Sequence, residues 1–195
     1  MTVGRRPTKA ELEQARGRPV DDLVGPGLRL LFVGINPGLW TAAVNAHFAR
    51  PGNRFWPALH RAGITDHQID ASTGFAPADT AALIEAGIGI SNLVDVATAR
   101  ADELTPAELR AGAERLRRLV ATTRPRVVAV LGLTAYRAAF GVRSAPTGRQ
   151  PEPFEGAELW VLPNPSGLNA HASLDVLAEW YRAAAEAAGI GLPPN

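Results

Sequence analysis

Two asparagines stand where apolar runs break into proline and glycine, and their chemistry is that of a neutral amide. Asn36 lies within GINPG (34–38), and Asn164 begins NPSGLN (164–169). An amide side chain offers one acceptor and two donors without charge, so it can orient a water molecule but is a poor general base. Proline and glycine shape such loops so that backbone N–H groups can face a ligand. The alternative for each Asn-Pro pair is an ordinary turn.

A carboxylate and an aromatic ring are further candidates. Asp95 ends the segment NLVD, where it could activate a water molecule for attack. A helix cap or an ion pair is the alternative for this carboxylate. The ring of Phe48 could stack on a flat ligand or simply pack in the core. Arg50 and Arg54 flank a Pro-Gly-Asn turn, where they could meet phosphate groups or remain solvated charges.

Neither metal ligation nor cysteine chemistry is expected of this chain. It has no cysteine, which excludes disulfides, thiolate-bound zinc, iron–sulfur clusters and a thiol nucleophile. The spacing of its four histidines is not that of metal ligands. We therefore expect no metal and no cofactor.

The elements that must position these side chains alternate along the chain. Apolar runs predict strands at 28–35, 88–94, 126–132 and 158–162. Capping residues, periodicity and terminal glycines predict helices within 8–17, 53–64, 77–87, 105–120, 134–141 and 173–189. The order predicts an α/β fold, a three-layer α/β/α sandwich with a mainly parallel central sheet. Ligands bind such sheets beyond the carboxyl ends of the strands, where Asn36 and Asn164 stand. Residues 143–156 read as a mobile surface connection.

The bulk composition is that of an ordinary globular protein. The 195 residues are 46% hydrophobic and 20% charged, which suits a single domain spanning 1–195. No apolar run approaches the roughly 18 residues of a transmembrane helix, and the first residues do not form a secretory signal, so we expect no membrane association and a cytoplasmic location. The net charge of +1 says little about partners, although all but one of the 20 basic residues are arginine.

Four segments, in order and at compatible spacing, carry a resemblance. They are GINPG (34–38), FARPGNRFW (48–56), NLVD (92–95) and VLPNPSGL (161–168). Together they resemble the mismatch-specific uracil-DNA glycosylases, which are bacterial relatives of thymine-DNA glycosylase in the uracil-DNA glycosylase superfamily. The resemblance covers about residues 28–181. It implies the fold of that superfamily and a monomer that acts on double-stranded DNA without a cofactor.

The resemblance also implies a reaction. The enzyme hydrolyses the N-glycosidic bond of uracil, or of thymine or etheno-cytosine, mispaired with guanine, after flipping the nucleotide out of the duplex. Asn36 matches the water-positioning asparagine, and Asp95 is a second candidate catalytic group. Ile35 and Phe48 match base-binding positions, with Phe48 as the stacking ring. Asn92 is a further candidate for base binding, at a position where some relatives carry lysine. A neutral asparagine barely deprotonates water, so slow chemistry is expected.

The last segment resembles the loop that enters the DNA. Leu168 matches the apolar wedge that fills the gap left by the flipped base. Contacts to the opposite strand or to phosphates would fall to the neighbouring positions of that loop, which are Asn164, Ser166, Gly167 and Asn169. The alternative for Leu168 is an apolar packing contact at the start of the predicted C-terminal helix. The residues that follow, NAHAS (169–173), differ from the Ser-Arg that bacterial relatives carry there.

Two other functions compete with this one. A noncatalytic DNA- or nucleotide-binding α/β module is the main alternative, because strand-end loops can bind phosphates without chemistry. A serine hydrolase using Ser166 is disfavoured, since the sequence lacks a G-x-S-x-G elbow.

Overall fold

A five-stranded sheet forms the centre of the computed structural model, which describes residues 4–167 and 172–193. The strands are β1 (Leu30–Gly34), β2 (Ile88–Asn92), β3 (Val127–Leu131), β4 (Gly148–Arg149) and β5 (Glu158–Leu162). Their spatial order is β2-β1-β3-β5-β4, with β4 antiparallel and the other neighbours parallel. The chain passes from β1 to β2 on one side and later to β3 on the other. Strand order therefore reverses at β1, where open sheets of this kind bind ligands.

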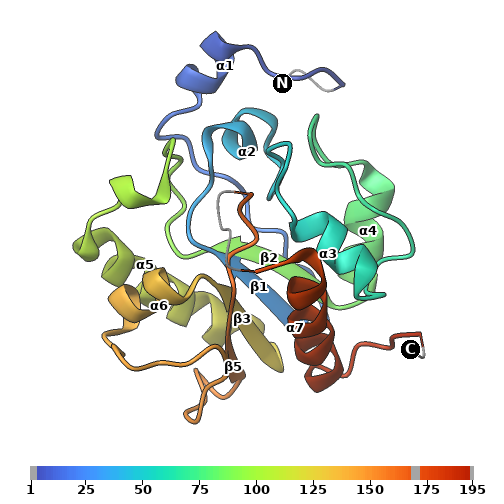
Figure 1. Cartoon of the computed structure of the whole chain (residues 1–195), viewed down its shortest axis with the longest axis vertical. Coiled ribbons are helices and arrows are strands. Elements are labelled where there is room, and N and C mark those ends of the chain that lie inside the picture. The colour runs from blue at the N-terminus through green and yellow to red at the C-terminus, as the bar shows by residue number, and fades with distance from the viewer. Residues whose placement is uncertain (1–3, 168–171, 194–195) are drawn as a thin grey trace.

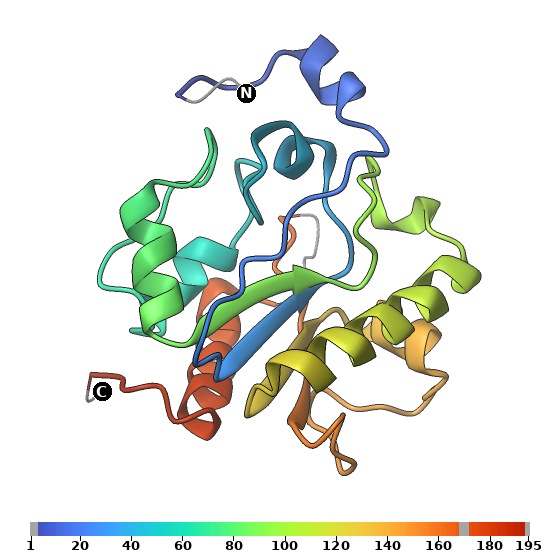
Figure 2. The same ribbon diagram turned by 180° about the vertical axis from the view of Figure 1, so that it is seen from behind.

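Helices cover both faces of the sheet (Figure 1). The helices are α1 (Lys9–Gln14), α2 (Leu39–Val44), α3 (Phe55–Arg61), α4 (Pro77–Glu85), α5 (Pro106–Thr123), α6 (Leu133–Phe140) and α7 (Leu174–Ala187), with a 3-10 turn at Ala101–Glu103. One face carries α3, α4 and α7, and the other carries α5 and α6, as the reverse view also shows (Figure 2). The expected three-layer α/β fold is confirmed.

Successive side chains of each buried strand point to opposite faces of the sheet and pack into the two clusters of the core. Leu30 and Phe32 of β1 join the cluster under α3 and α7, whereas Leu31 and Val33 join the cluster under α5 and α6. All four side chains are fully buried. A strand buried on both faces needs no polar alternation, which is why β1 reads as a continuous apolar run.

Two elements, α2 and β4, are not expected from the sequence. Helix α2 begins at Gly38, which has no side chain to cap the first turn, and its residues read as a loop of small side chains. The two residues of β4 pair with β5 as an antiparallel edge inside the segment 143–156, so part of the predicted connection is a strand. At two residues, β4 is too short to show the period of a strand.

Candidate active site

A cavity of about 320 Å³ opens at the carboxyl edge of the sheet. Its floor is made by the ends of β1, β2 and β3, through Gly34, Asn92 and Leu131. Its walls come from the loops that follow these strands and from the segment after β5. Among the lining residues are further positions predicted from the sequence, namely Ile35, Asn36, Phe48, Asn164 and Ser166. The structure thus brings both Asn-Pro loops to one hollow at the strand-order reversal.

The amide of Asn36 is held by its nitrogen. Nδ2 lies 2.8 Å from Oγ1 of Thr98 and 3.2 Å from the carbonyl oxygens of Pro37 and Val96. The hydroxyl of Thr98 gives its own hydrogen to the carbonyl of Arg100 at 2.7 Å, so toward Asn36 it can only accept. Because all three partners accept hydrogen bonds, the amide atom that faces them must be the nitrogen of Asn36 and not its oxygen. Among the described residues no group donates to Oδ1 of Asn36, so this oxygen is the end of the amide left for a ligand.

Phe48 forms an aromatic wall of the cavity. Its ring is stacked on that of Phe55, with centroids 4.0 Å apart and planes at 23°. The side chain is only half-buried and also lines the cavity. Core packing and ligand stacking are the two roles that the sequence allows. The structure shows the packing, and ligand stacking by this ring stays a prediction. Phe48 has a φ of 54°, a left-handed conformation that is costly for a bulky residue and that tends to occur at functional sites.

Gly34 leaves room between Phe48 and Asn92. A Cβ at position 34 would lie 2.5 Å from Oδ1 of Asn92 and 3.3 Å from the ring of Phe48. The amide oxygen of Asn92 therefore lies directly against the bare Cα at the end of β1. Asn92 itself is 4% exposed, so a polar atom is presented from an almost fully buried side chain.

Asp95 stands apart from this cavity. Its carboxylate is 3.5 Å from Nε of Arg115 on α5, and its side chain is 44% exposed. It is not among the described residues that line the cavity. The ion pair, which is one of the alternatives that the sequence allows, is what the structure contains. Its predicted part in catalysis stays a prediction.

Arg54 binds the backbone of the segment that follows β5. One guanidinium nitrogen of Arg54 donates to the carbonyl of Ser166 at 2.9 Å, and the other donates to the carbonyl of Ala172. Arg54 therefore has a structural role in holding this segment, and the predicted phosphate contact of Arg54 stays a prediction. Oδ1 of Asn164 accepts from the amide of Ser166 at 2.8 Å and closes the turn.

Gly167 closes the described part of this loop. A Cβ there would lie 2.7 Å from the carbonyl oxygen of Gly52, so the two loops approach as closely as glycine allows. Leu168 and Asn169, the predicted wedge and its neighbour, lie outside the described residues. Their predicted roles stay predictions.

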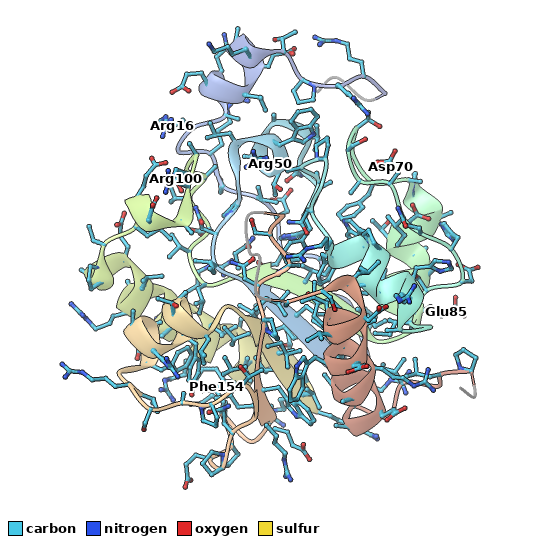
Figure 3. The ribbon with its side chains drawn as sticks, viewed as in Figure 1. Arg16, Arg50, Asp70, Glu85, Arg100 and Phe154 are labelled. Carbon is cyan, nitrogen blue, oxygen red and sulfur yellow. The ribbon has the colours of Figure 1, made fainter. Side chains whose placement is uncertain are left out.

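Two arginines stand at the rim of the cavity. Arg50 and Arg100 both line it from exposed positions on different loops (Figure 3). Arg100 is bound by Asp102, whose carboxylate oxygens lie 2.5 and 3.0 Å from guanidinium nitrogens. Among the described residues no carboxylate forms an ion pair with Arg50, so the charge of Arg50 is less compensated than that of Arg100. Thr98 and Arg100 are not predicted from the sequence, since nothing in their local sequence marks them and only the fold brings them to Asn36.

No three metal-binding side chains gather within the part of the chain that the structure describes. Over the same residues, no helix combines the length and hydrophobicity needed to cross a bilayer.

This fold, with a neutral amide at the end of β1 and a cavity at the strand-order reversal, defines an α/β protein with a ligand site at the carboxyl edge of its sheet. The family model of the uracil DNA glycosylase superfamily matches residues 22–188, so the chain belongs to that superfamily. The fold is also similar to a solution NMR structure of a proposed uracil DNA glycosylase from Methanosarcina acetivorans, with a TM-score of 0.58 and 18% identity. That match covers 86% of this chain and 97% of the other, and at this identity it speaks for the fold alone.

Proposed function

We propose that this protein is a monofunctional DNA glycosylase that removes uracil mispaired with guanine from double-stranded DNA. Membership of the uracil DNA glycosylase superfamily supports a DNA glycosylase role. The observation that carries the finer proposal is the geometry of Asn36, whose amide nitrogen is tied down while its oxygen remains available at the cavity. Thymine and etheno-cytosine opposite guanine are further candidate substrates.

The reaction would proceed on a nucleotide turned out of the helix, because a stacked base cannot reach a cavity at the sheet edge. The base would lie against the ring of Phe48, over Gly34. A water molecule held by Oδ1 of Asn36 would attack C1′ as the bond between C1′ and the base breaks. The base leaves with the electron pair of the broken bond and takes up a proton from solvent, while the attacking water loses a proton to solvent, so the products are an abasic sugar and the neutral free base.

The protein's contribution would be positioning and fixed dipoles rather than a charged base. Neutral Asn36 accepts one hydrogen of the water and aims its lone pair, which is a proximity effect. Backbone N–H groups near Ile35 and Phe48 would stabilise the charge that develops on the leaving base. Without a carboxylate at the water, the chemical step should be slow.

DNA would be engaged from the segment after β5 and from the rim. Leu168 would fill the gap in the base stack, with Asn169, Ser166 and Gly167 near the opposite strand. Arg50 would meet a backbone phosphate. We infer that the protein acts on one duplex as a monomer.

A panel of oligonucleotides tests this proposal. Uracil, thymine, etheno-cytosine and hypoxanthine would each be placed opposite guanine, opposite adenine and in single strands. With protein in excess, we expect abasic product from uracil opposite guanine, and less from uracil opposite adenine. If every lesion stays intact while the duplex is bound, the noncatalytic DNA-binding alternative replaces the glycosylase.

A further inference from the structure

His47 lies buried directly behind the cavity, and its hydrogen bonds fix where its hydrogen is. The side chain is 2% exposed. Its Nε2 lies 2.9 Å from the carbonyl oxygen of Asp21, which can only accept a hydrogen bond. Nε2 must therefore carry a hydrogen and donate it. In the neutral ring this leaves Nδ1 as a bare acceptor.

The acceptor on His47 in turn fixes the amide of Asn92. Nδ1 of His47 lies 3.3 Å from Nδ2 of Asn92. Since Nδ1 has no hydrogen, the amide must present its nitrogen to His47 and its oxygen away from it. That oxygen is the atom that lies against Gly34 beside the ring of Phe48. A chain of hydrogen bonds thus runs from the carbonyl of Asp21 through His47 and Asn92 to the cavity.

We propose that His47 is a positioning residue that holds the oxygen of Asn92 toward the cavity, so that the site selects a base with a ring N–H group. This inference rests on the proposed function. Uracil and thymine carry a hydrogen on N3, which an amide oxygen can accept. Etheno-cytosine carries none, so this selection would disfavour it among the candidate substrates. Cytosine has a lone pair on N3, which the same oxygen would repel. Selection of this kind is strong when the polar group of the site is buried, because the wrong base leaves it unpaired.

The surroundings of His47 favour the neutral ring that this arrangement needs. Burial lowers the pKa of His47 below its ordinary value, outweighing the opposite effects of its hydrogen bond to Asp21 and of the nearby charge of Asp22. The positive charge of Arg115 on α5 also lowers this pKa. Arg115 is fixed there by Asp22 at 2.7 Å and by the carbonyl of Asn92 at 3.0 Å.

Protonation of His47 would reverse the amide. Both ring nitrogens would then donate, so Nδ1 would require an acceptor from Asn92. The amide would turn by 180°, and its nitrogen would face the cavity in place of its oxygen. The selectivity for a ring N–H group should therefore weaken in acid, below the lowered pKa of His47.

The test begins with the free protein. Long-range ¹H–¹⁵N spectra at neutral pH should show His47 as the Nε2–H tautomer, with side-chain amide hydrogens of Asn92 close to the Hε1 of that ring. An Nδ1–H tautomer or a charged ring at neutral pH overturns the proposal. Because no DNA is present, the tautomer of His47 can be determined whether or not the proposed function is correct.

A variant then tests the consequence for selectivity. Binding would be compared for duplexes carrying the non-cleavable 2′-fluoroarabino forms of uridine or cytidine, each opposite an abasic-site analogue. Wild-type protein should prefer uridine, and His47→Phe should lose at least about tenfold of that preference, the scale of one misdirected hydrogen bond. His60→Phe, on the exposed end of α3, is the matched control and should change nothing. Unchanged preference in a folded His47→Phe overturns the proposal.

A protein that binds neither duplex beyond undamaged DNA would count against the proposed function. In that case the tautomer spectra still decide whether His47 holds Asn92 as described. The two failures can therefore be told apart.

Discussion

Thr98 should control the rate of the proposed reaction through its hydrogen bond to Asn36. Its hydroxyl is the nearest of three acceptors around the amide nitrogen of Asn36, at 2.8 Å against 3.2 Å for the two carbonyl groups. Thr98→Val keeps the shape of the side chain and removes both the bond to Asn36 and the bond to the carbonyl of Arg100. The amide of Asn36 then loses the contact that best fixes its direction.

The size of the effect follows from the number of bonds lost. A neutral hydrogen bond contributes about 1 kcal/mol, and two are removed here, one of which bears on the position of the attacking water. A loss of about 1–2 kcal/mol in the transition state corresponds to a rate that falls about 5- to 30-fold. Ground-state binding of the duplex should hardly change, because the amide oxygen of Asn36 is still present.

Single-turnover kinetics measures this rate, with protein in excess over a duplex that contains uracil opposite guanine. Thr98→Ser keeps the hydroxyl and should retain most of the wild-type rate. Thr123→Val is the matched control, since its hydroxyl donates to the carbonyl of Leu119 within α5. A Thr98→Val protein as fast as wild type, or a Thr98→Ser protein as slow as Thr98→Val, would show that the hydroxyl of Thr98 does not position Asn36.

Three further perturbations follow from the same structure. Gly34→Ala places a Cβ 2.5 Å from the oxygen of Asn92, so the rate of excision should fall more than about tenfold and the unfolding free energy by about 1–3 kcal/mol. Gly191→Ala, which has open space around it, is the control and should change neither the rate of excision nor the unfolding free energy. Arg54→Lys cannot hold the carbonyls of Ser166 and Ala172 together, so urea denaturation should show a loss of about 1–3 kcal/mol that the exposed Arg50→Lys does not share, and equal stability of the two variants would argue against this structural role of Arg54. The lowered pKa of His47 means that the unfolded state binds more protons just below pH 6.5, so the unfolding free energy should fall from that pH downward and level off below the lowered pKa. Asp66 and Asp79 raise the pKa of His67, so His67 stabilises the fold in acid and loses that effect as the pH rises through its own pKa. Wild type is therefore best compared with His47→Phe, which should lack the fall in unfolding free energy that His47 causes in acid.

The sequence predicted the elements well where local physics decides them. The capping box of Thr105 and Glu108 fixes the start of α5, and both residues bond as the pattern predicts. The apolar run ending at Gly34 predicted β1 and, with it, the edge at which Asn36 stands. The sequence did not predict helix α2, because Gly38 offers no side-chain cap and the six residues of the helix are too few to show a helical period.

The site was predictable only in part, because its geometry depends on contacts between distant segments. Asn36 and Phe48 could be singled out from their motifs. Thr98 lies 62 positions beyond Asn36 in the chain, and only the fold joins them. Arg54 has the side chain of a phosphate ligand, but the structure pairs it with two carbonyl groups. Asp95 could have faced the cavity or Arg115, and its strand-end position did not distinguish between the two.

The neutral amide at residue 36 is proposed to aim the attacking water, and one paired experiment examines this role. Single-turnover formation of abasic product from a duplex with uracil opposite guanine would be measured in parallel with binding to a non-cleavable copy of the same duplex. We predict that Asn36→Ala binds the non-cleavable duplex within a few-fold of wild type and forms product at least about a hundredfold more slowly. An Asn36→Ala protein that binds normally and excises uracil at the wild-type rate would contradict this role for the amide.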